Sequence, residues 1–132
     1  MLDTNIVSDL IRNPSGIVSD RIREVGEHSV CVSIIVAAEI RFGCAKKGSR
    51  RLTRQAEALL KALPVLPLEA PVDWEYADIR ADLEKGGMPI GPNDLLIAAH
   101  ARHLGHVLVT DNTDEFKRVR DLKVESWLNP TF

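Results

Sequence analysis

The sequence contains few of the residues on which disulfide-rich or membrane-spanning folds depend. Only Cys31 and Cys44 are present among 132 residues. Two cysteines outside Cys-x-x-Cys spacing exclude a disulfide framework, so we expect buried thiols. Charged residues interrupt every apolar run well before the roughly 20 residues that a membrane span needs. No basic segment followed by an apolar one begins the chain, so we expect no secretory signal and a cytoplasmic protein.

The chain also lacks an excess of either charge, but its charges are segregated. Lys and Arg number 17 and Asp and Glu 19, which gives a net charge of −2 and argues against a general nucleic-acid coat. Between residues 41 and 61, seven basic residues stand against one acid, Glu57. This cluster is either a solvated helix face or a surface that attracts nucleic acid. Its central members are Lys46, Lys47, Arg50, Arg51 and Arg54.

The apolar pattern predicts helices that alternate with short strands. Proline and glycine residues punctuate most of the boundaries. The predicted helices cover residues 4–12, 17–25, 34–47, 50–63, 71–85 and 92–104, followed by a short helix after Asn112. The predicted strands cover residues 29–33, 65–68, 106–110 and 124–127, and only Met1 and Leu2 can form a strand before Asp3. Pro67 places the strand at residues 65–68 at a sheet edge.

This alternation is typical of an α/β domain with a largely parallel sheet covered on both faces. At this length we expect one domain, residues 1–132. The functional crevice of such a sheet lies outside the carboxyl ends of its strands.

Four carboxylates fall near that predicted edge. Asp3 and Asp111 follow predicted strands, and Asp94 lies in the first turn of the helix that begins at Pro92. Glu39 is the single charge in the apolar stretch 34–40, where burial is costly unless the carboxylate is paired or bound to a metal. Taken singly, each residue has a structural alternative: a helix cap, a turn residue, a first-turn acid or a solvent-facing acid.

Converging carboxylates repel one another unless a cation neutralises them. Oxygen ligands suit Mg²⁺ or Mn²⁺, which can activate water and stabilise a leaving oxygen in phosphodiester cleavage. The spacing of the four acids therefore points to nuclease chemistry.

The sequence resembles PIN-domain ribonucleases, and among them the VapC-type toxins of bacterial toxin-antitoxin (VapBC) pairs. The matching stretches cover nearly the whole chain: Leu2-Asp3-Thr4-Asn5, residues 33–43, Ile79-Arg80-Ala81, residues 89–99 and Val109-Thr110-Asp111-Asn112. The stretch from Pro92 to Ala99 is the most specific of them. The resemblance implies a three-layer α/β/α sandwich, in agreement with the pattern.

The resemblance also implies roles for individual residues. Asp3, Glu39 and Asp94 would be metal-site acids, with Asp111 as the fourth, and Asn5, Ser33 and Thr110 would orient carboxylates or water. Asp114 and Glu115 rank second for the fourth position, because Glu115 can instead form a capping box with Asn112.

The implied activity is endoribonucleolytic cleavage of structured RNA such as tRNA, dependent on Mg²⁺ or Mn²⁺. The implied partners are a cognate VapB-type antitoxin and a second copy of the chain, in a homodimer and a toxin-antitoxin hetero-oligomer in the bacterial cytoplasm.

Two other classes of function stay open at this point. One is a phosphoacceptor domain, which would want a second aspartate where Asn5 stands, and the other is a catalytically silent module that binds a partner. His100 and His103 lie one helical turn apart, but they lack the further ligands of a zinc site. We interpret both histidines as surface or helix-end residues.

Overall fold

A computed structural model describes residues 1–128. The helices are α1 (Thr4–Arg12), α2 (Ile17–Val25), a 3₁₀ turn η1 (Glu27–Ser29), α3 (Ile34–Lys47), α4 (Arg50–Ala62), α5 (Val72–Lys85), α6 (Pro92–Leu104) and α7 (Thr113–Phe116). The strands are β1 (Val32–Ser33), β2 (Val65–Leu66), β3 (Leu108–Val109) and β4 (Val124–Glu125). The last four residues of the predicted 1–132 domain lie outside the described part.

The helix boundaries follow local signals in the sequence. Ser33 and Ser49 cap α3 and α4, where their side-chain oxygens accept the backbone N–H groups of Ile35 and Leu52. Gly48 and Gly105 end α3 and α6 with φ of 65° and 68°, a left-handed conformation that favours glycine. Helices α1 and α2 span the predicted residues. Helix α4 ends one residue earlier than expected.

The strands are shorter than predicted. Ser29, where the first of the predicted strands should begin, is instead the last residue of η1. The chain turns into η1 at Gly26, whose φ is 93°. Beyond η1, only Val32 and Ser33 pair with β2. The segments expected at 65–68, 106–110 and 124–127 likewise keep two paired residues each.

Short as they are, the strands form one parallel arrangement. β1 pairs with β2, and β3 pairs with β4. Leu2 joins the two pairs, since its N–H donates to the carbonyl of Cys31 (2.9 Å) and it forms a parallel bridge to Val109. The order across the sheet is β2, β1, Leu2, β3, β4, and β2 lies at an edge, as Pro67 predicted.

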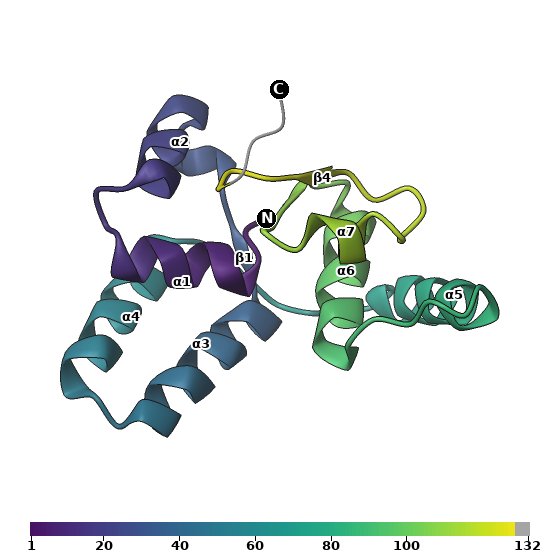
Figure 1. Ribbon diagram of the computed structural model, residues 1–132, viewed down its shortest axis with the longest axis horizontal. Coiled ribbons are helices and arrows are strands. Elements are labelled where there is room, and N and C mark those ends of the chain that lie inside the picture. The colour runs from purple at the N-terminus through teal and green to yellow at the C-terminus, as the bar shows by residue number, and fades with distance from the viewer. Residues whose placement is uncertain (129–132) are drawn as a thin grey trace.

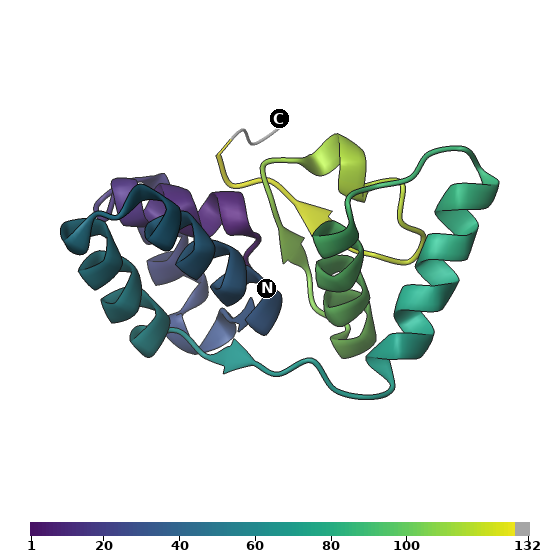
Figure 2. The same cartoon turned by 90° about the horizontal axis from the view of Figure 1, so that it is seen from below.

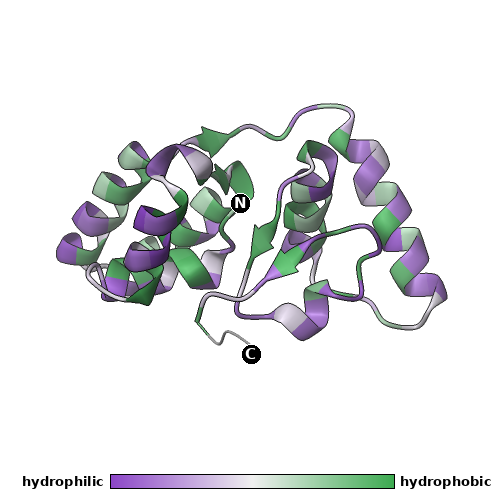
Figure 3. Cartoon of the chain, turned by 90° about the horizontal axis from the view of Figure 1, so that it is seen from above, coloured by the Kyte–Doolittle hydropathy of each residue, from purple (hydrophilic) through white to green (hydrophobic). Residues whose placement is uncertain are grey.

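The helices cover the strands on both sides, which confirms the α/β/α prediction. Figure 1 shows α1 to α4 grouped apart from α5 and α6, and Figure 2 shows the strands between these two groups. Figure 3 shows mostly hydrophobic residues in the strands. Leu108 of β3 is fully buried, as are Leu2 and Phe116. Cys31 and Cys44 are buried free thiols, as expected.

No helix within residues 1–128 is long and apolar enough to span a lipid bilayer.

Candidate active site

Asp3 is the most buried acid of the candidate site, with 4% of its surface exposed. It follows Leu2 directly and is also the N-cap of α1, where its Oδ1 accepts the N–H of Thr4 (2.8 Å). The Asp3 side chain is therefore both the N-cap of α1 and a residue of the candidate site. Its Oδ2 accepts the hydroxyl of Thr110 (2.7 Å). Burial raises the pKa of Asp3 and the nearby negative charges of Glu39 and Glu115 add to this, while the two hydrogen bonds lower it.

Thr110 links the strand ends around Asp3. Besides donating to Asp3, its hydroxyl oxygen accepts the N–H of Asn112 (3.0 Å) and the side-chain amide of Asn5 (3.4 Å). The carbonyl oxygen of the Asn5 side chain accepts the N–H of Asp111 (3.1 Å). Asn5 and Thr110 thus lie beside the acid, where the sequence places them.

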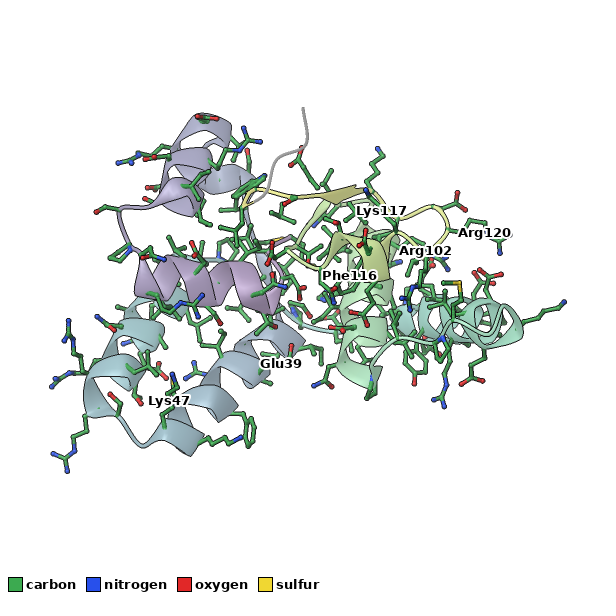
Figure 4. The ribbon with its side chains drawn as sticks, viewed as in Figure 1. Glu39, Lys47, Arg102, Phe116, Lys117 and Arg120 are labelled. Atoms are coloured by element: carbon green, nitrogen blue, oxygen red, sulfur yellow. The ribbon has the colours of Figure 1, made fainter. Side chains whose placement is uncertain are left out.

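Glu39 points toward α1 rather than toward Arg41. Its Oε1 accepts the hydroxyl of Thr4 at 2.5 Å, and its side chain is half-buried. Figure 4 labels it on α3, near the first turn of α1. Arg41 pairs instead with Glu57 of α4. The solvent-facing alternative for Glu39 is therefore wrong.

Asp94 carries the clearest electrostatic signature in the site, a pKa raised from 3.8 to about 7. Burial is the largest cause, followed by the negative charges of Glu115 and Asp3, a hydrogen bond with Glu115, and the charge of Glu39. Four carboxylates from four different elements therefore act on one another. We call Asp3, Glu39, Asp94 and Glu115 the acid cluster.

Glu115 reaches this cluster from α7. Its Oε1 accepts the N–H of Gly91, just before α6 (3.3 Å), and its Oε2 accepts the side-chain amide of Asn112. Asn112 makes no side-chain cap bond to α7, so the predicted capping box does not form. The reason is that the backbone N–H of Asn112 is directed to Thr110.

Asp111 and Asp114 are both exposed, unlike Glu115. Neither of them is among the charges that raise the pKa of Asp94 or of Asp3. The structure therefore brings together three of the four first-ranked acids, and it adds second-ranked Glu115 to them instead of Asp111.

The chemistry of this donor set fits a hard divalent cation, since four carboxylates converge and one pKa is raised to about 7. As the side chains stand in residues 1–128, however, no three His, Cys, Asp or Glu residues are in position to hold one ion. Thr4 and Asn112 hold Glu39 and Glu115 by hydrogen bonds. The acids are close enough to repel one another, and they are not arranged as ligands of one ion.

The predicted basic cluster lies beyond the acids, at the turn between α3 and α4. All of its members are exposed: Lys46, Lys47, Arg50, Arg51 and Arg54. Lys47 and Glu39 line the same cavity of about 150 Å³, together with Arg12, Ile40 and Leu52. Figure 4 shows Lys47 at the opposite end of α3 from Glu39. One member of the basic cluster, Lys47, therefore shares a cavity with one member of the acid cluster, Glu39.

His100 is the residue that the sequence interpretation misplaced. It has only 2% of its surface exposed, so it is not a surface or helix-end residue. Its Nδ1 lies 2.9 Å from the hydroxyl of Ser33, between α6 and the start of α3. His103 is exposed, as expected. The signal that could have located His100 is its position in the nearly continuous apolar run 95–101.

The comparisons with known proteins identify the family of the chain. The PIN domain family matches residues 1–122. The chain is 40% identical to Ribonuclease VapC2 of Haemophilus influenzae, covering 97% of each protein. It is 36% identical to the tRNA(fMet)-specific endonuclease VapC of Shigella flexneri, covering 96% of each. A crystal structure of VapBC2 from Rickettsia felis bound to a DNA fragment from its promoter matches with a TM-score of 0.89 and 33% identity, over 96% of this chain and 97% of that one.

The family model, the named relatives and the solved structure each match most of the chain. This chain therefore belongs to the PIN domain family and is of the VapC type.

Proposed function

We propose that this chain is a divalent-metal-dependent endoribonuclease and the toxin component of a toxin-antitoxin pair. The observation that carries the proposal is the acid cluster, in which burial and three neighbouring carboxylates raise the pKa of Asp94 to about 7. Repulsion between the carboxylates costs the folded chain free energy, and a bound cation would offset that cost. The relatives named as ribonucleases support the same activity.

Asp3, Glu39, Asp94 and Glu115 are the residues that would hold Mg²⁺ or Mn²⁺. We place Glu115 ahead of Asp111 and Asp114 because its charge acts on both Asp94 and Asp3. The chemistry that such a cation supplies is activation of water and neutralisation of charge on phosphoryl oxygens.

The chain's own residues prepare this chemistry by fixing the carboxylates. Thr110 donates to Asp3 and is itself held by Asn5 and Asn112. Thr4 donates to Glu39 through its hydroxyl and to Asp3 through its backbone N–H. Hydrogen bonds from hydroxyl groups fix the carboxylates of Asp3 and Glu39 in one orientation in the metal-free chain.

RNA is the substrate class that we propose, and tRNA in particular. The support for tRNA is the name of the Shigella flexneri relative. The basic cluster from Lys46 to Arg54 would attract the phosphate backbone toward Glu39, since both line or adjoin one cavity. At a net charge of −2, such attraction is local rather than general.

A cognate VapB-type antitoxin is the proposed partner, because solved relatives are VapBC complexes. We infer that it places a cation in the acid cluster, and arginine is the suitable group because its planar fork pairs with carboxylates and stays charged. A homodimer, a hetero-oligomer with the antitoxin and a bacterial cytoplasmic location complete the proposal.

The test is incubation of the purified chain with total bacterial RNA and Mg²⁺ or Mn²⁺, followed by mapping of the new RNA ends. We expect one discrete cleavage site that EDTA abolishes. Asp3→Asn and Asp94→Asn should each lose most of the cleavage. Asp73→Asn is the matched control, since Asp73 is an exposed first-turn acid of α5 outside the acid cluster.

Cleavage that persists in excess chelator would contradict metal dependence. A folded chain that cuts no RNA under any of these conditions, yet binds a partner, would instead support the silent-module alternative.

A further inference from the structure

Buried polar side chains are few in this protein, and they form two hydrogen-bonded pairs. Within residues 1–128 they are Asp3, Ser33, His100 and Thr110. Asp3 and Thr110 pair at 2.7 Å inside the acid cluster. Ser33 and His100 pair at 2.9 Å. Ser33, which the resemblance placed beside the acids, bonds Ile35 and His100 and no member of the acid cluster. A second buried polar pair in an otherwise apolar core calls for an explanation, because burial of polar groups is costly unless it serves a purpose.

The Ser33–His100 pair connects the two helices that carry acids. Ser33 ends β1 and caps α3, which carries Glu39, while His100 lies on α6, which carries Asp94. Each acid lies six residues from the pair along its own helix, or about 9 Å of helical rise. A change of contact at the pair is therefore transmitted to both acids through less than two turns of rigid helix.

The chemistry of the contact favours one ring nitrogen. The Ser33 hydroxyl oxygen already accepts the N–H of Ile35 (3.1 Å), so its proton is available to Nδ1 of a neutral imidazole. Burial, together with the positive charges of His106 and His103, lowers the pKa of His100 and favours the neutral ring. The directional hydrogen bond between His100 and Ser33 fixes the distance between α6 and the first turn of α3. An apolar side chain of equal volume would not fix this distance.

We propose that His100 is a positioning residue: through Ser33 it holds α6 to the start of α3, and so limits how far apart Asp94 and Glu39 stand when they close on a metal ion. The inference rests on the proposed function, because it assigns the pair a role in metal binding. It makes His100 a determinant of metal affinity, although it touches no acid of the cluster.

Two isosteric substitutions separate this role from core filling. In His100→Asn the side-chain amide replaces Nδ1 and can still bond Ser33, whereas in His100→Gln the amide replaces Nε2 and leaves Ser33 without its partner. The measurement is the Mn²⁺ concentration at half-maximal thermal stabilisation, which needs no RNA and no activity. We expect a midpoint about 10-fold higher in His100→Gln, and a midpoint within about 2-fold of the wild type in His100→Asn.

A double-mutant cycle and a stability control complete the design. In a Ser33→Ala background, His100→Gln should raise the Mn²⁺ midpoint no further, because the two residues act through one bond. Val18→Ala on α2 removes buried core volume elsewhere, so it should lower the unfolding temperature without moving the midpoint.

Equal midpoints for His100→Asn and His100→Gln, or additive effects with Ser33→Ala, would overturn the positioning role. If the wild type and Asp94→Asn both fail to respond to Mn²⁺ or Mg²⁺, it is the proposed function that fails, and the two failures are thereby distinguished.

Discussion

Asp94→Asn should make the metal-free chain more stable, although it removes a residue that we place at the centre of the reaction. The pKa of Asp94 is about 7 in the folded chain, against 3.8 for an ordinary aspartate. At about 1.4 kcal/mol per pH unit, this difference corresponds to about 4 kcal/mol of destabilisation when the group is ionised. Solvent screening of a partly exposed carboxylate reduces the value, and we expect about 2 kcal/mol.

The sign of the pH dependence follows from linkage. Between pH 3.8 and about 7 the folded state holds the proton of Asp94 more tightly than the unfolded state does, so the stability of the wild type falls as pH rises through this window. Above pH 7 the full destabilisation is present. The stability difference between Asp94→Asn and the wild type should therefore be largest at pH 8 and should disappear toward pH 4.

Urea unfolding in EDTA, followed by circular dichroism from pH 4 to pH 8, measures this difference directly. A gain of about 2 kcal/mol corresponds to about 8 °C in unfolding temperature for a domain of this size. Asp73→Asn should show no such gain, because Asp73 has only the helix dipole beside it. If Asp94→Asn proves no more stable than the wild type at pH 8, or if its gain does not depend on pH, the electrostatic account of the acid cluster is wrong.

Three further outcomes follow from the described contacts. In a cleavage assay at limiting Mn²⁺, Glu115→Gln should raise the metal requirement about 10-fold while Asp111→Asn stays close to the wild type, and the opposite order would return Asp111 to the fourth position. Phe116→Ala should lower the free energy of unfolding by about 4 kcal/mol in urea, since Phe116 is fully buried, and a loss below about 1 kcal/mol would argue against its place in the core. Arg102→Met should lower the free energy of unfolding by about 2 kcal/mol in the same assay, because the Arg102 side chain is 12% exposed and bonds Glu75 at 2.5 Å. An unchanged unfolding curve would show that this ion pair between α5 and α6 is not stabilising.

The sequence predicted helices better than strands, for a physical reason. Helix signals are local, as the Ser33 and Gly48 caps of α3 show, and each of them acts within a few residues of the boundary that it sets. A strand is defined by its partner. Val107 is as β-prone as the residues after it, but only Leu108 and Val109 meet β4 in register.

The candidate site shows the same limit. Asp3 could be selected because it follows a predicted strand, and Glu39 because it is the single charge in an apolar stretch. Asp94 could be selected because it lies in the first turn of the helix from Pro92, within the stretch most specific for the family. The choice between Asp111 and Glu115 depends on how α7 sits against Gly91, a contact across 24 residues that no local pattern encodes. The burial of His100 was missed although the apolar run 95–101 indicates it, and only the meeting of α6 with Ser33 shows what the ring contacts.

The position of Leu2 in the middle of the sheet bears on when during synthesis the protein can become active. Asp3 is held from the far end of the chain: its N–H donates to the carbonyl of Val109, and its carboxylate accepts the hydroxyl of Thr110. Contacts of such large sequence separation close late, because the entropy of a loop of about 100 residues must be overcome first. A nascent chain leaves the ribosome with its N-terminus first. Asp3, synthesised about 100 residues before β3, therefore waits for that strand before it has its partners, and a ribosome-bound fragment that stops short of Thr110 carries an incomplete acid cluster.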